Sequence, residues 1–189
     1  MNNSAKNSAD LVINGVTGID PSVDDAARRQ FRDTLGHFAT GVTVMTTTAS
    51  DGELVGITVS SFNSLSLNPP LILWSIADTS TSYRNFNVGE AFAVNVLAED
   101  QEDLAMSFAK AGADKFKSVN VLAGLDDVLL IDGCVVYFEC SVDARYPGGD
   151  HDIIVGRVRR IFNIGKSPLV FHGGALRALG EQFDRLAED

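Results

Sequence analysis

The chain of 189 residues is long enough for one compact domain, and its 45% apolar and 21% charged residues exclude a wholly disordered chain. A formal net charge of −10 disfavours nucleic-acid partners, because phosphate backbones repel an acidic surface. No apolar run approaches the roughly 20 residues of a membrane span, and the first ten residues lack a signal-peptide pattern, so we expect a cytoplasmic protein without a membrane partner.

The N-terminal part changes character at about residue 20. Residues 1–20 are rich in Asn, Ser and Gly and are expected to form a mobile arm, followed by one domain over 21–175 and a tail over 176–189. Pro21 opens a predicted helix, and Ser22 is its expected N-cap. Apolar residues then recur at helical spacing and predict one apolar face: Ala27, Phe31, Leu35 and Phe38.

The chain beyond Gly41 is dominated by strand patterns. β-Branched residues and turn signals predict strands from Val42 onward and over 54–62, 71–76, 92–97, 134–144 and 153–162. A loop over 145–150 joins the last two. Short helices fit near 80–87, over 101–111 and after Gly174. Strands at short spacing with little helix between them favour an antiparallel barrel over a doubly wound parallel sheet.

The usual catalytic and metal motifs are absent. There is no G-x-G-x-x-G, and Gly165-Lys166-Ser167 lacks the first glycine of a phosphate loop. Cys134 and Cys140 are too few for a disulfide framework and are expected to be buried and reduced. The three histidines are scattered and no metal site is expected: His37, His151 and His172.

A dense run of small polar residues spans 58–66. Hydroxyls and free backbone N–H groups at a strand end can hold a phosphate or the polar edge of a ring without a net positive charge. A serine-rich turn between strands explains the same run without any ligand. The residues alone leave both interpretations open.

Four segments carry a resemblance to a known family. They are FRDTLGHFATGVTVMTT (31–47), GITVSSFNSLSLNPP (56–70), GDHDIIVGRV (149–158) and PLVF (168–171). In this order they resemble the small flavin reductases, the NAD(P)H:flavin oxidoreductases of two-component monooxygenases. The resemblance implies a mainly β, homodimeric split β-barrel, a Greek-key FMN-binding fold with a few peripheral helices.

The resemblance also implies an activity. A pyridine nucleotide, NADH in preference to NADPH, would pass a hydride to N5 of a flavin, FMN in preference to FAD, and the reduced flavin would serve a partner such as a monooxygenase component. Because the cofactors carry this chemistry, the lack of a catalytic side-chain set agrees with it. Two alternatives stay open: a redox protein whose reduced flavin reduces ferric chelates, and a non-catalytic flavin-binding protein.

Site residues follow from the resemblance position by position. Flavin contacts are expected along one strand, where Gly56 would let the backbone approach the ring closely, with further contacts around the phosphate arm. The expected flavin-binding residues are Val55, Gly56, Ile57, Thr58, Ser60, Ser61, Ser75, Ala77, Ser80, Thr81, Ser82, Phe108, Lys115 and Phe116. Plain core packing explains Phe108 and Phe116 equally well.

The nicotinamide side is expected to depend on His151. It ends the tripeptide Gly149-Asp150-His151, which resembles the family's G-D-H motif, and an imidazole there can donate a hydrogen bond or relay a proton. The expected nucleotide contacts are His151, Phe171, His172, Gly173 and Gly174. Arg157, Arg159 and Arg160 would suit a 2′-phosphate, or lie away from the site.

Overall fold

A computed structural model of the chain describes residues 12–112 and 115–180. The chain divides into two units, residues 1–39 with 172–174 and residues 40–171 with 175–189. Residues 1–11 of the predicted arm and 181–189 of the predicted tail lie outside the described residues.

The first unit contains a small hairpin and one helix. Strands β1 (Val12–Ile13) and β2 (Val16–Thr17) pair antiparallel around Asn14 and Gly15, which both have positive φ. This hairpin lies within the stretch that the sequence predicted as an unstructured arm. Helix α1 (Asp25–Leu35) is capped by Asp24, whose carboxylate accepts from the N–H of Ala27 at 2.7 Å.

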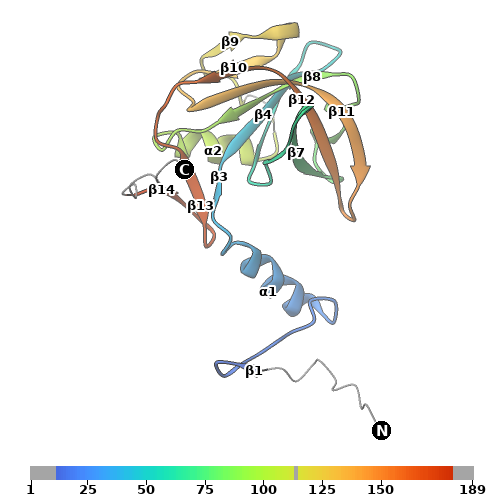
Figure 1. Cartoon of the computed structure of the whole chain (residues 1–189), viewed down its shortest axis with the longest axis vertical. Coiled ribbons are helices and arrows are strands. Elements are labelled where there is room, and N and C mark those ends of the chain that lie inside the picture. The colour runs from blue at the N-terminus through green and yellow to red at the C-terminus, as the bar shows by residue number, and fades with distance from the viewer. Residues whose placement is uncertain (1–11, 113–114, 181–189) are drawn as a thin grey trace. The chain divides into compact units, whose positions relative to one another are not determined.

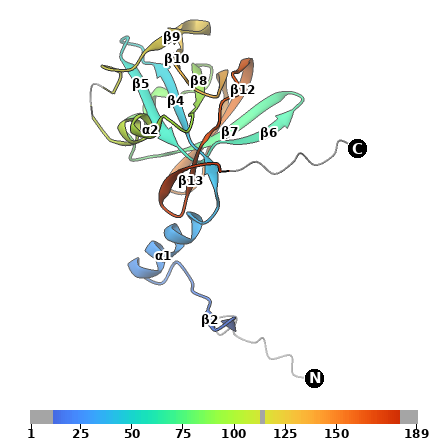
Figure 2. The ribbon, with the colours of Figure 1, turned by 90° about the vertical axis from the view of Figure 1, so that its left-hand side faces the viewer.

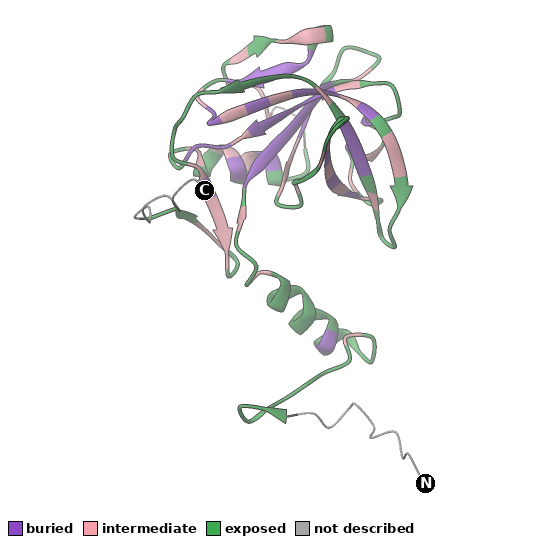
Figure 3. Ribbon diagram, in the orientation of Figure 1, coloured by how far each residue is buried: buried purple, intermediate pink, exposed green. Residues whose placement is uncertain are grey.

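The prediction of Ser22 as the helix cap was therefore wrong. Ser22 instead donates to Asp20, so its hydroxyl stabilises the preceding turn. The predicted apolar face of α1 does exist, but among its members only Ala27 is buried. Phe31, Leu35 and Phe38 are 49, 57 and 74% exposed, and the helix is almost wholly coloured as exposed in Figure 3.

The second unit is built on a seven-stranded antiparallel sheet (Figure 1). Its strand order is β5-β4-β8-β11-β12-β7-β6, so β5 and β6 form the two edges. The strands are β4 (Thr43–Thr48), β5 (Leu54–Val59), β6 (Asn63–Leu67), β7 (Pro70–Ala77), β8 (Ala91–Val96), β11 (Val136–Pro147) and β12 (His151–Asn163).

Shorter elements complete this unit (Figure 2). Strands β3 (Thr40–Gly41), β13 (Leu169–His172) and β14 (Ala175–Ala178) form a second sheet, and β9 (Val121–Ala123) pairs with β10 (Leu129–Ile131). The helical pieces are η2 (Tyr83–Asn85), α2 (Glu102–Ala109) and η3 (Leu125–Asp127). The helix expected after Gly174 is thus the strand β14, and the helix expected over 80–87 is a single 3-10 turn.

Two of the predicted strand boundaries were wrong. The expected strand 54–62 ends at Val59, and a separate strand, β6, begins at Asn63. The expected loop 145–150 shrinks to 148–150, because β11 runs to Pro147 and the N–H of Gly148 donates to the carbonyl of His151 at 2.7 Å. His151 is consequently the first residue of β12.

The core of the second unit consists of two apolar clusters. One is centred on the aromatic rings of Trp74, Phe86 and Phe92, which are all fully buried. The other contains Phe108 and Cys134, and Cys140 belongs to the first, so both thiols are buried and free as expected. Burial raises the pKa of each thiol to about 12, which leaves them unreactive. The mainly β fold is confirmed, while the split-barrel topology and the dimer stay predictions.

Candidate functional site

Two pockets follow one edge strand of the sheet. Strand β5 pairs with β4 on one side only, so the backbone groups along its other side are not used by a neighbouring strand of the described chain. Such an edge offers N–H and C=O groups to a ligand. The first pocket lies around 53–56 and the second around 57–61.

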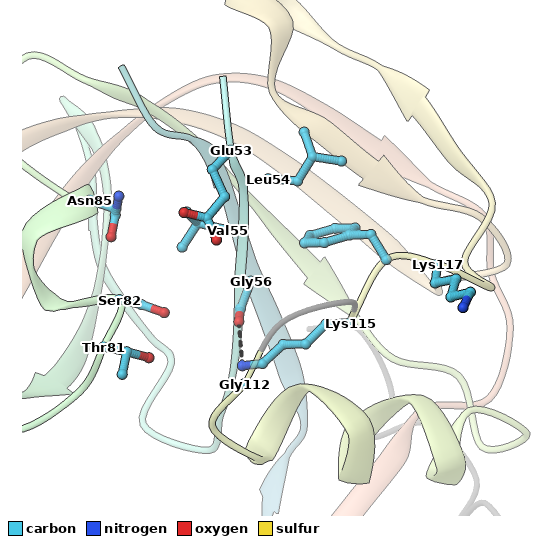
Figure 4. A pocket seen from close by; sticks show the side chains of 11 residues that line it. Glu53, Leu54, Val55, Gly56, Thr81, Ser82, Asn85, Gly112, Lys115 and Lys117 are labelled. Atoms are coloured by element: carbon cyan, nitrogen blue, oxygen red, sulfur yellow. Dashed lines mark hydrogen bonds between the residues drawn. The ribbon is translucent and has the colours of Figure 1, made fainter. Parts of the chain in front are cut away.

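The first pocket has a volume of about 410 Å³ (Figure 4). Thr81, Ser82 and Asn85 form one wall, with the hydroxyls of Thr81 and Ser82 directed toward β5. The complete lining is Glu53, Leu54, Val55, Gly56, Thr81, Ser82, Asn85, Gly112, Lys115, Phe116 and Lys117. Hydroxyl, amide and ammonium donors around one cavity suit an anionic group such as a phosphate.

At this pocket, Lys115 links β5 to α2 through hydrogen bonds. Its ammonium donates to the carbonyl oxygens of Gly56 at 3.0 Å and Phe108 at 3.1 Å. Partial burial lowers the pKa of this amine from its ordinary value. Two of the three ammonium donors are thus engaged within the described chain, which leaves one for a ligand.

Gly56 permits a close approach, but the ring that approaches it belongs to the protein. A Cβ atom at this position would lie 2.5 Å from Cδ1 of Phe108 and 3.1 Å from Cζ of Phe116. The two phenyl rings meet edge to face, 4.9 Å apart. Gly56 therefore has a packing role, in which two aromatic rings support β5, and the expectation that it lets the backbone approach a flavin ring stays a prediction.

The second pocket has a volume of about 500 Å³ and gathers the hydroxyl-rich end of β5. Its lining is Ile57, Thr58, Val59, Ser60, Ser61, Ser75, Ile76, Ala77, Gly148 and His151. The hydroxyl of Ser61 accepts from the N–H of Ser75 at 2.9 Å and so holds the end of β5 beside β7. Thr58 donates its hydroxyl to the carbonyl of Ala105 at 2.7 Å, so this side chain ties β5 to α2.

His151 stands at the rim of the second pocket. Its Nδ1 lies 2.8 Å from a carboxylate oxygen of Asp150, and 46% of the side chain is exposed. This hydrogen bond lowers the pKa of the Asp150 carboxyl. Because Asp150 engages Nδ1, the other ring nitrogen, Nε2, is the one left for a ligand.

The structure brings most predicted site residues to these two pockets. Val55, Gly56, Thr81, Ser82, Lys115 and Phe116 line the first, and Ile57, Thr58, Ser60, Ser61, Ser75, Ala77 and His151 line the second. Three predicted residues of the second unit line neither pocket: Ser80, whose hydroxyl accepts from the N–H of Ser82; Phe108, which is fully buried; and Phe171, which packs against the core. His172, Gly173 and Gly174 belong to the first unit, and their predicted role stays a prediction.

Several pocket residues were missed by the sequence analysis. Asn85 and Lys117 line the first pocket and Gly148 lines the second. Lys117 follows Lys115 by two residues, and this proximity in sequence could have identified it as a pocket residue. Asn85 carried no signal, because it lies on a 3-10 turn that the sequence does not distinguish from a longer helix.

Two findings concern other classes of site. Within residues 12–112 and 115–180, no group of three His, Cys, Asp or Glu side chains is placed to hold a metal ion. None of the helices in those ranges has the length and apolar character needed to cross a bilayer.

The chain is similar to several proteins that are named as flavin reductases or as reductase components. The FMN reductase (NADH) SmoA of Agrobacterium fabrum is 42% identical over 154 residues, covering 82% of this chain and 87% of that protein. The reductase component of the flavin-dependent trigonelline monooxygenase of Acinetobacter baylyi is 41% identical over 147 residues, covering 78% of this chain. This chain spans about half the length of that relative and of a probable flavin reductase of Rhizobium meliloti.

Solved structures and the family profile agree with these relatives. The NADH:FAD oxidoreductase SgcE6 of Streptomyces globisporus, in complex with NAD and FAD fragments, matches with a TM-score of 0.76 at 36% identity. The match covers 88% of this chain and 97% of that one. The profile of the flavin reductase like domain matches residues 35–180. Since that profile covers most of the chain, and a relative that is 42% identical over 82% of this chain is named an FMN reductase, this chain belongs to the flavin reductase like domain family.

Proposed function

We infer that this chain is an NAD(P)H-dependent flavin reductase that prefers FMN to FAD and delivers reduced flavin to an acceptor such as a partner monooxygenase. The observation that carries this proposal is the second pocket, which His151 lines together with the hydroxyl-rich end of an edge strand in a chain of this family. Relatives named as reductase components of monooxygenases support the choice of acceptor.

The residues of the two pockets fit a flavin phosphate and a ring. An FMN phosphate needs donors, and Thr81, Ser82, Asn85 and Lys117 supply them in the first pocket. The unpaired side of β5 supplies backbone groups that can bond the polar edge of an isoalloxazine. Both cavities together, of about 410 and 500 Å³, have room for a ligand of this size.

In the proposed mechanism, the residues of the two pockets would hold a flavin and a reduced nicotinamide, which would supply the hydride chemistry, and the protein contributes position and charge. The β5 edge would hold the acceptor ring, and the half-buried ring of Phe116 lines the first pocket. Asp150 orients the imidazole of His151 through Nδ1. When both ring nitrogens carry protons, Nε2–H of His151 can donate to the nicotinamide carboxamide or toward the negative charge that develops on the flavin.

The arginines of β12 support NADH over NADPH. A 2′-phosphate requires an unpaired cation near the ribose. All three arginines are already paired with carboxylates of the second unit: Arg157 with Asp143, Arg159 with Asp126 and Arg160 with Glu139. They also follow His151 by six to nine residues along an extended strand, roughly 20–30 Å away.

The proposal includes a cytoplasmic homodimer. Its support is the apolar face of α1, where Phe31 and Leu35 are exposed in the single chain, together with the exposed Phe38 just beyond the helix. Apolar side chains gathered on one helix face are typical of an interface. A second copy of the same chain is the occupant that the proposal assigns to this face.

Stopped-flow reduction of bound FMN by NADH tests the proposed role of His151. His151→Ala should slow flavin reduction by about 10- to 1,000-fold, the span of one lost oriented donor or proton relay. Flavin affinity should change much less, because β5 supplies most of the proposed contacts. Tyr146→Ala is the matched control: it removes an exposed side chain from the same hairpin, lines neither pocket, and should leave the rate unchanged.

Two results would count against the proposal. A wild-type protein that neither binds FMN nor oxidises NADH in its presence would remove the assigned activity altogether. An active protein in which His151→Ala reduces flavin at the wild-type rate would leave the activity standing and return His151 to a role in its own loop.

A further inference from the structure

A partly buried polar cluster joins three elements of the second unit. Its members are Arg145 of β11, Asp152 of β12 and Tyr83 of η2, called the Arg145 cluster below. Nε of Arg145 donates to Oδ2 of Asp152 at 2.6 Å, and the Tyr83 hydroxyl donates to the same oxygen at 2.7 Å. The guanidinium carbon lies 4.0 Å from the centre of the Tyr83 ring. The side chains of Arg145 and Asp152 are only 15 and 17% exposed, so the cluster is largely shielded from water.

On one side, the cluster holds a wall of the first pocket. Nη1 of Arg145 donates to the backbone carbonyls of Tyr83 at 3.1 Å and Phe86 at 3.2 Å, the two ends of the η2 turn. The pocket residues of this wall are Thr81, Ser82 and Asn85, which lie within two residues of Tyr83. A shift of the Tyr83 ring would therefore move the donors proposed for the flavin phosphate.

On its other side, the cluster fixes the backbone next to His151. Asp152 directly follows His151 in β12, and these two residues pair with Ile76 and Ala77 of β7. The N–H of Asp78 donates to the carbonyl of Asp150 at 3.1 Å, which adds a second link between the β7 end and the same hairpin. The position of His151 is thus coupled, through Asp152, to the position of the η2 turn.

We propose that the Arg145 cluster is a positioning device that fixes the η2 wall of the first pocket relative to His151 at the second. The inference rests on the proposed function, in which these two places hold the flavin and the nicotinamide. Hydride transfer requires donor and acceptor atoms at about 3–3.5 Å, and small misplacements reduce the rate strongly. A rigid link between the two binding places would preserve this distance through each turnover.

The variant Tyr83→Phe tests this coupling, because it removes one hydroxyl and keeps the ring over Arg145. We expect FMN binding to weaken and flavin reduction at saturating FMN and NADH to slow, each by about three- to tenfold. The matched control is Asp143→Asn, which breaks the Arg157 pair across the same two strands without lining either pocket. It should match wild type in both quantities. A purely structural hydroxyl would lower the melting temperature and leave the saturated rate unchanged.

The outcomes separate this inference from the proposed function. A wild-type protein without NADH-dependent flavin reduction would overturn both. An active wild type with an unchanged saturated rate in Tyr83→Phe would overturn the positioning role alone. If emission of the buried Trp74 shows Tyr83→Phe to be unfolded, Arg145→Lys replaces it, because lysine keeps the charge but cannot bridge both η2 carbonyls. Loss of folding in both variants would assign the cluster to stability and overturn the proposal.

Discussion

Even a methyl group at Gly56 should destabilise the fold. A Cβ atom there would lie 2.5 Å from Cδ1 of Phe108 and 3.1 Å from Cζ of Phe116, whereas carbon atoms in favourable contact are about 3.5–4.0 Å apart. Phe108 is fully buried, so its ring cannot move toward solvent. Overpacking of this kind costs about 1–3 kcal/mol, and the smaller freedom of the unfolded chain offsets about 0.4–1 kcal/mol of that loss.

Gly56→Ala should therefore lose a net of about 1–2 kcal/mol, which lowers the melting temperature by about 2–8 °C for a chain of this length. Thermal unfolding followed by fluorescence measures this directly, because Trp74 is the single tryptophan and is fully buried. Gly41→Ala is the matched control: Gly41 also lies in a strand, and no heavy atom comes within 4 Å of a Cβ there.

The double variant Gly56→Ala/Phe108→Leu isolates the contact. A smaller side chain at 108 makes room for the new methyl group, so the two changes together should cost less than the sum of their separate effects. Two results would contradict this reasoning: Gly56→Ala melting at the same temperature as Gly41→Ala, or strictly additive effects of Gly56→Ala and Phe108→Leu. Either would show that the close contact between β5 and the Phe108 ring does not limit the side chain at position 56.

Two further predictions concern other parts of the chain. Leu35→Ser on the exposed face of α1 should convert the proposed dimer into a particle of 20.2 kDa, measured by sedimentation, whereas a wild type that already sediments at that mass would rule the dimer out. The pKa of buried Glu139 is lowered in the folded protein, mainly by the hydrogen bond from Arg160, so its stabilising effect is present above its unfolded pKa of about 4.3 and is lost as the pH falls below it. In urea, the stability gap between wild type and Glu139→Gln should be widest above about pH 5 and should close toward pH 3; a gap that does not change with pH would contradict the assignment.

The sequence predicted the strands well where side-chain chemistry was uniform. β-Branched residues over 42–48, and large apolar residues over most of 71–76, favour strands, and β4 and β7 lie there. Predictions failed where short-range hydrogen bonding decides the outcome. Ser22 and Asp24 are both good caps, and only the backbone direction selects Asp24. The sequence of the β11–β12 hairpin predicts a loop, because Pro147 is followed by two glycines. In the structure, β11 continues to Pro147 and the turn is confined to those glycines and the next residue.

The sequence predicted the residues of the candidate site that lie in motifs. It did not predict the contacts that support them. His151 and the hydroxyls of β5 lie in short motifs, so their neighbours in space follow from neighbours in sequence. Lys115 was expected among the flavin-binding residues, but its hydrogen bonds to the carbonyls of Gly56 and Phe108, which are 59 and 7 residues away in sequence, could not be inferred. The Arg145 cluster escaped for the same reason, because Tyr83 and Asp152 are 69 residues apart.

The acidic composition of the chain and its proposed anionic ligands place a constraint on how binding can occur. With a formal net charge of −10, long-range attraction cannot concentrate a phosphate at the surface. The arginines of β12 do not change this, because each is neutralised by a carboxylate. Affinity must then come from short-range donors: hydroxyls, the β5 edge, one remaining ammonium donor of Lys115, and Lys117. Such donors act only at hydrogen-bond distance, so their position matters more than their charge, and a shielded cluster that fixes that position gains importance in a protein of this composition.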